Sequence, residues 1–244
     1  MSLDTTSARS RMLGRLRNHA PAAPATTVEA LDASIDAHFA PRRAYTPLAL
    51  SERIAQFQQM LEAAHAEVIR ASTASWAADL AQRLAAAGVR SLLLDTACAE
   101  GQALAAALPA AVQARSYARP IEQWKAELFD TVDAGFTVAR SGLAATGTLV
   151  VAPDANAPRT VSLVPPLHVA LIHARTLHAD LHAAVAAERW SEGMPTNLVM
   201  ISGPSKTSDI QQTTAYGAHG PRALWVVIVT DDTGVTSAQP GAAQ

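Results

Sequence analysis

The fold of this chain is indicated by two apolar segments near its C-terminal end, residues 197–202 (NLVMIS) and residues 223–229 (ALWVVIV). Each is short, and each adjoins a Gly-Pro pair, which is typical of a buried strand that meets a turn. Between them, residues 205–210 (SKTSDI) place hydroxyl and carboxylate side chains where a helix commonly begins. The sequence therefore predicts a buried strand, a Gly-Pro loop, a brief helix, a Gly-rich turn and a second buried strand.

The rest of the chain repeats this alternation of apolar runs and helical patterns. Helices are predicted over residues 50–65, 75–87 and 100–108, the second ending at Gly88. Short strand patterns cover residues 67–70, 89–95, 136–139, 149–151 and 168–172. Strands that alternate with helices of this length indicate parallel βαβ units, so we expect an α/β fold with a mainly parallel sheet covered on both faces.

Three regions follow from the pattern. Residues 1–48 are predicted to form a helical N-terminal region and linker, because an Arg-rich amphipathic pattern precedes the helix-breaking Pro21 and Pro24. Residues 49–232 are predicted to form one α/β domain. Residues 233–244 are rich in Gly, Pro, Ser and Gln, so we expect a disordered tail.

Composition excludes several classes of protein. A formal net charge of −2 without a clustered basic surface argues against nucleic-acid binding. The single cysteine, Cys98, cannot supply the thiolates of an iron–sulfur cluster, and we interpret it as a buried thiol. No apolar run reaches the ~20 residues of a membrane span, and the N-terminus lacks a signal-peptide core. We therefore expect a cytoplasmic protein with no membrane span.

Two loops carry the candidate site. A strand that runs through Gly203-Pro204 into a helix N-terminus would favour an anion, and Ser205, Lys206 and Thr207 stand at that point. The turn before residues 223–229 adds the imidazole of His219 and the guanidinium of Arg222, which suit a proton transfer and a carboxylate or phosphate contact. A plain helix cap at Ser205 is the alternative interpretation.

A third polar turn and a group of histidines lie earlier in the chain. Thr146-Gly147-Thr148 offers two hydroxyls and an unhindered backbone, so we place it on the rim of the same site, although an ordinary turn explains it too. Four histidines fall close together, and we assign them packing or solvated roles because no metalloprotease pattern accompanies them: His168, His173, His178 and His182. No nicotinamide or flavin fingerprint occurs. We expect neither a metal nor a cofactor.

The ordered motifs resemble the LUD-domain family, in its lactate utilization protein C branch. The resemblance lies in residues 203–210 (GPSKTSDI), residues 217–222 (GAHGPR), the Thr146-Gly147-Thr148 turn and residues 11–17 (RMLGRLR). It implies a Rossmann-like fold akin to sugar isomerases and CoA transferases. It also implies a part in oxidising L-lactate to pyruvate beside iron–sulfur partner subunits.

One residue departs from the family pattern. Many relatives have an acidic or other polar residue just before Thr-Gly-Thr, whereas this chain has Ala145. If that acid is a catalytic base in the family, this chain lacks one at that position. Two functions are compatible with the sequence: a subunit of a lactate-oxidising assembly that binds a small carboxylate or phosphate, or an independent enzyme or binder of a phosphorylated or CoA-linked small molecule. His219 is the candidate catalytic residue in either case.

Overall fold

The computed structural model describes residues 6–19, 27–43, 48–208 and 213–231. The chain divides into two compact units, residues 1–47 and residues 48–244. The first unit contains α1 (Thr6–His19) and α2 (Val28–Arg43), whose apolar side chains Met12, Leu16, Val28 and Leu31 are exposed. The predicted disordered tail, residues 233–244, lies outside the described residues.

The second unit is built on a six-stranded sheet in which every pair of neighbours is parallel. Its order is β1-β12-β7-β4-β2-β3, and its strands are β1 (Glu67–Ser72), β2 (Ser91–Leu93), β3 (Gln113–Arg115), β4 (Ala134–Val138), β7 (Leu167–His173) and β12 (Ala223–Thr230). The apolar runs of β7 and β12 are buried on both faces, as a parallel sheet requires. The expected α/β fold with a mainly parallel sheet is confirmed.

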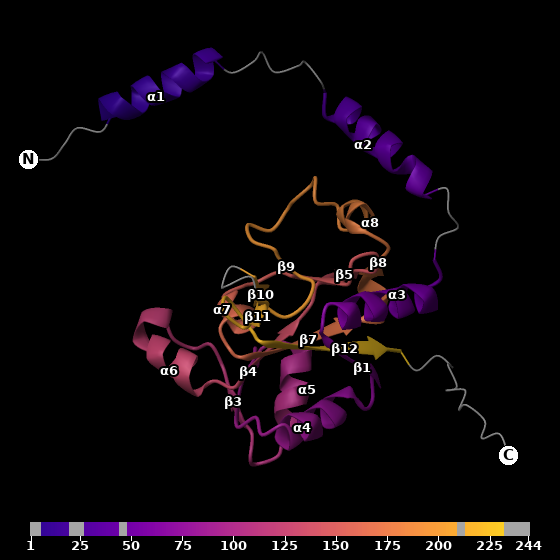
Figure 1. The fold of residues 1–244 in the computed structure, drawn as a ribbon, viewed down its shortest axis with the longest axis vertical. Coiled ribbons are helices and arrows are strands. Elements are labelled where there is room, and N and C mark those ends of the chain that lie inside the picture. The colour runs from indigo at the N-terminus through magenta and orange to yellow at the C-terminus, as the bar shows by residue number, and fades with distance from the viewer. Residues whose placement is uncertain (1–5, 20–26, 44–47, 209–212, 232–244) are drawn as a thin grey trace, which may run out of the picture. The chain divides into compact units, whose positions relative to one another are not determined.

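One face of this sheet is covered by helices (Figure 1). α4 (Trp76–Ala86) and α5 (Ala99–Ala107) pack there against Phe136, Leu171 and Val227. α4 ends as predicted, because Gly88 takes a φ of +78° that other residues rarely adopt. The Cys98 thiol accepts a hydrogen bond from the Gly101 N–H at the start of α5, and burial is the main cause that raises its pKa.

The other face carries α3 (Leu50–Ala63) and a second, four-stranded sheet of order β8-β5-β6-β9. Its strands are β5 (Ser141–Leu143), β6 (Thr148–Val151), β8 (Leu177–His178) and β9 (Val199–Ile201). Phe57 and Leu61 of α3 fill the space between the two sheets together with Ala170, Ile172 and Val226 of the main sheet. Shorter elements complete the unit: 3₁₀ turns at Ile121–Gln123 and Ala174–Thr176, α6 (Lys125–Thr131), α7 (Thr160–Leu163) and α8 (Leu181–Ala187).

Two local predictions near the motif loops need correction. The strand predicted before Gly203 forms as Val199–Ile201, but it is not buried, because it pairs antiparallel with β6 in the second sheet and leaves Met200 45% exposed. The helix predicted to begin at Ser205 does not form at residues 205–208. Lys206–Thr207 instead forms β10 and pairs antiparallel with β11 (Ala215–Tyr216), so the backbone hydrogen bonds of this segment are satisfied by a distant segment. Residues 209–212 lie outside the described part.

Candidate functional site

The two motif loops contact each other directly. The Ser205 N–H donates to the Pro221 carbonyl over 2.8 Å, and the Gly217 N–H donates to the Ser205 carbonyl over 2.8 Å. Gly217 has a φ of +81°, and a Cβ at Gly220 would lie only 3.2 Å from the Cβ of Ser205. Glycine at both positions therefore lets the turn that carries His219 lie against the loop that carries Ser205.

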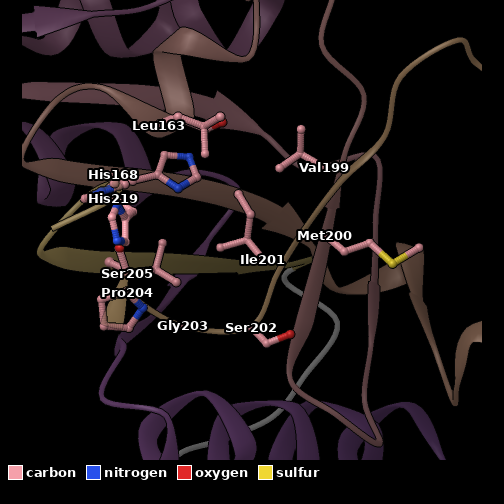
Figure 2. A pocket seen from close by; sticks show the side chains of 14 residues that line it. Leu163, His168, Val199, Met200, Ile201, Ser202, Gly203, Pro204, Ser205 and His219 are labelled. Atoms are coloured by element: carbon pink, nitrogen blue, oxygen red, sulfur yellow. The ribbon is translucent and has the colours of Figure 1, made fainter. Parts of the chain in front are cut away.

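A hollow of about 200 Å³, which we call the histidine hollow, opens where these loops meet. Figure 2 shows its polar end, where His168, His219 and Ser205 gather, and its apolar side, where Leu163, Val199 and Ile201 lie. It is situated at the amino ends of β7 and β12, because His168 and Leu224 are the second residues of those strands.

The helix α7 forms one side of the hollow, and its close packing against the main sheet requires a glycine, Gly135 of β4. A Cβ on Gly135 would lie 2.0 Å from the Val161 carbonyl oxygen, so α7 sits directly against β4 at this position. The next two residues of α7, Ser162 and Leu163, line the hollow. Gly135 is also the register partner of His168 on β7.

His168 is the most buried polar side chain of the hollow, with 1% of its surface exposed. Its Nε2 atom lies 2.8 Å from the hydroxyl of Thr137 on β4. Burial lowers the pKa of His168 to about 4, because the charged imidazolium would lose its hydration without gaining a carboxylate partner. The ring is therefore neutral at neutral pH.

The Thr-Gly-Thr turn does not line the hollow itself but contacts Ser202, which does. The Thr146 and Thr148 hydroxyls lie 2.7 Å apart, and the Thr148 hydroxyl lies 2.7 Å from that of Ser202, which lines the hollow. Gly147 has a φ of +61°, and a Cβ there would lie 2.8 Å from the Leu61 N atom of α3. Close packing against α3 thus explains this glycine.

The structure does not bring all the predicted site residues together. Ser205 and His219 line the histidine hollow, whereas Lys206 is exposed on β10 beside Thr207. Arg222 lines a different hollow of about 260 Å³ with Asp133 and Trp225, and its N–H donates to the Pro166 carbonyl. The predicted cations are therefore not part of the lining of the histidine hollow.

The four histidines go to separate places. His173 Nε2 lies 2.8 Å from a Glu100 oxygen, and His178 Nε2 lies 3.7 Å from a Glu188 oxygen. In the described ranges no three His, Cys, Asp or Glu side chains are grouped so that they could hold a metal ion. Of the four, only His168 lines the histidine hollow, whereas the sequence suggested a packing or solvated role for all four. Its position inside the apolar run of residues 167–173 (LHVALIH) was the signal that it is buried.

The fold and the hollow define an α/β protein with a small candidate site, lined by two histidines, at the amino ends of the strands of a parallel sheet. Residues 54–229 match the LUD domain, and the chain belongs to the LUD-domain family. Among the described helices, none combines the length and apolar composition that a membrane span requires.

Several proteins are similar to this chain. An uncharacterized protein of Neisseria meningitidis is 39% identical over 183 residues, which cover 74% of this chain and 78% of that protein. Lactate utilization protein C of Halalkalibacterium halodurans is 34% identical over 42% of this chain, and that of Shouchella clausii is 34% identical over 48%. The chain spans about half the length of these two relatives, 46% and 50%.

A crystal structure of a DUF162 family protein from Deinococcus radiodurans has the same fold. It matches with a TM-score of 0.57 and 22% sequence identity, covering 75% of this chain and 99% of that chain.

Proposed function

We propose that this chain acts in the oxidation of L-lactate to pyruvate and that the histidine hollow binds a small carboxylate in that process. The observation that carries the proposal is the contact between the two motif loops, which places Ser205 and His219 in one hollow with a buried histidine. The similarity to proteins named lactate utilization protein C supports the choice of metabolic role.

The size and polarity of the hollow suit an acid with few heavy atoms. At about 200 Å³ it is smaller than the ~300–1,000 Å³ pockets that hold drug-sized ligands. Its polar end can hydrogen-bond a carboxylate and an adjacent oxygen, while Leu163, Val199 and Ile201 can contact a short alkyl group. A 2-hydroxy or 2-oxo acid of three carbons has both parts.

His219 and Ser205 have different roles in this proposal. His219 is exposed, so it can contact the carboxylate while that group keeps part of its hydration, and histidine is the side chain that most often exchanges protons at neutral pH. The Ser205 hydroxyl can donate to the same carboxylate. The backbone bonds between the two loops fix the positions of both residues.

We also propose iron–sulfur partner subunits for this chain. Oxidation of lactate releases two electrons, and a chain with one cysteine cannot hold the cluster that would accept them. Anaerobic purification of the tagged chain from cells grown on L-lactate tests this part. We expect iron–sulfur subunits to co-purify in stoichiometric amounts, and isolation of the chain alone would contradict the assembly.

The proposal is tested by deleting this gene and measuring growth on L-lactate. We expect growth to be lost and to return with the parent gene. Ser205→Ala and His219→Ala should restore it poorly, by roughly tenfold or more in lactate-dependent oxygen uptake, because each removes a hydrogen bond to a charged ligand. Ser191→Ala, at an exposed serine before β9, is the matched control and should restore growth fully. Full rescue by both hollow variants would contradict the proposal.

A further inference from the structure

One hydrogen bond within the protein orients the ring of His168. Its Nε2 lies 2.8 Å from the hydroxyl of Thr137. The side chain is 99% buried and lines the histidine hollow (Figure 2). Because Thr137 engages Nε2, Nδ1 is the ring nitrogen with which a ligand in the hollow can form a hydrogen bond.

The electrostatics of the hollow limit the ligand. No lysine or arginine is among the described residues that line it, and burial keeps the His168 ring neutral. A neutral imidazole offers one hydrogen bond but no full positive charge. A carboxylate placed beside it would lose hydration without compensation, whereas an uncharged hydroxyl or keto oxygen would lose much less.

We propose that His168 is the specificity residue of the hollow: its ring, oriented by Thr137, hydrogen-bonds through Nδ1 to the 2-hydroxyl or 2-oxo oxygen of a small monocarboxylate. This inference rests on the proposed function, since it takes the hollow to be the acid-binding site. The carboxylate then lies toward the exposed His219. Phosphate esters are disfavoured because the described residues that line the hollow include no fixed cation.

The ring tautomer decides which oxygen is preferred. If the Thr137 hydroxyl donates to Nε2, then Nδ1 carries the proton and favours an acceptor such as a keto oxygen. If Nε2–H donates to Thr137, then Nδ1 accepts and favours a hydroxyl. The ratio of lactate to pyruvate affinity therefore identifies the tautomer.

Titration calorimetry on the full chain tests the inference with L-lactate, pyruvate and propionate, which lacks the second oxygen. We expect the better of the first two to bind about tenfold or more tightly than propionate, because a site built to hydrogen-bond an oxygen rejects an analogue without it. His168→Gln retains a polar group near the Nε2 position only and should reduce this ratio to within about twofold. His168→Asn retains one near Nδ1 and should preserve part of it.

A second measurement does not depend on a variant that folds. In the ¹⁵N-histidine-labelled wild-type protein, the His168 ring signals should shift on addition of lactate or pyruvate and hardly at all with propionate. Equal binding of the three acids by the wild type, an unchanged ratio in His168→Gln, or tighter binding of phosphoenolpyruvate than of pyruvate would overturn the inference. If the wild type binds none of the acids, the proposed function itself fails.

Discussion

The two ends of strand β7 carry the same residue type in opposite electrostatic settings. At the amino end His168 is buried, neutral and bonded to a hydroxyl. At the carboxyl end His173 is 17% exposed and bonded to Glu100, and this hydrogen bond is the main cause that lowers the pKa of the Glu100 carboxyl. The difference shows that burial and the available partner, rather than the residue type, decide whether a histidine is hydrogen-bonded to a neutral hydroxyl or to a carboxylate.

The groups near the amino ends of the sheet strands also differ in charge from those near the carboxyl ends. Ligands in open parallel sheets usually lie beyond the carboxyl ends of the strands. In this protein that edge carries Asp95, Asp154 and Glu100, which would repel a carboxylate, and the first two line a cavity of about 140 Å³ with Cys98. The motif loops meet at the amino edge instead, because the loop after β9 comes from the second sheet. An acidic ligand is therefore better matched to the amino edge.

The largest expected effect concerns the pH dependence of stability at His168. Its pKa in the folded protein, about 4, lies below the usual unfolded value of ~6.5, so the unfolded chain takes up a proton first as the pH falls. The free energy of unfolding should therefore decrease between about pH 6.5 and pH 4, by roughly 3 kcal/mol from this group.

Urea unfolding of the wild type and of His168→Gln at pH 7.0 and pH 4.5 measures this contribution. The difference in unfolding free energy between the two proteins should shift by about 2–3 kcal/mol in disfavour of the wild type at the lower pH. Other titrating groups are common to both proteins and cancel. A difference that is the same at both pH values would mean that His168 is not buried in its neutral form.

The next largest effect is the loss of stability on replacing one of two glycines, Gly135 near the amino ends of the strands and Gly101 near their carboxyl ends. Cβ atoms at Gly135 and Gly101 would lie 2.0 Å and 1.7 Å from the carbonyl oxygens of Val161 and Asp95. Replacing either glycine by alanine forces its backbone away from the neighbouring carbonyl. We expect each change to lower the free energy of unfolding by roughly 2–3 kcal/mol.

Only one of the two replacements should weaken ligand binding. Gly135→Ala moves α7 away from β4 and with it Ser162 and Leu163, so lactate binding should weaken by about tenfold or more. Gly101→Ala acts at the far edge and should leave the lactate Kd within about twofold. Calorimetry at a temperature where both variants are folded separates the outcomes. Equal loss of binding would show that the hollow responds to general destabilisation.

The sequence predicted the main sheet well because its strands are continuous apolar runs. Residues 223–229 and 168–172 fall in strands that are buried on both faces, and residues 136–138 of the predicted 136–139 fall in β4. The second sheet was missed in part, since no strand was predicted at Ser141–Leu143. That strand contains a glycine because a Cβ at Gly142 would lie 2.6 Å from Ile172, a packing requirement between distant segments that local propensity does not reveal.

The sequence predicted the two loops of the candidate site but not the buried His168 beneath them. Two ordered Gly-containing motifs suggested that Ser205 and His219 act together, and the structure places them in one hollow. The helix expected at Ser205 was wrong, because Ser, Thr and Asp favour turns and ribbons as readily as helix caps. Pairing of β10 with β11 then turned Lys206 away from the lining.

The smallest expected effect is that of removing the two cations first assigned to the site. Lys206 is exposed on β10, and Arg222 lines the neighbouring hollow with Asp133 and Trp225, so neither needs to touch a ligand of the histidine hollow. Lys206→Ala and Arg222→Ala should each change the lactate Kd by less than about twofold at 0.15 M salt, where exposed charges beyond ~8 Å are largely screened. His219→Ala, measured alongside, should weaken binding by about tenfold, because it removes a direct hydrogen bond to a charged group. A tenfold loss in either cation variant would mean that the flexible side chain reaches the ligand, and the acid would then be held by charge rather than by neutral hydrogen bonds as we propose for His168.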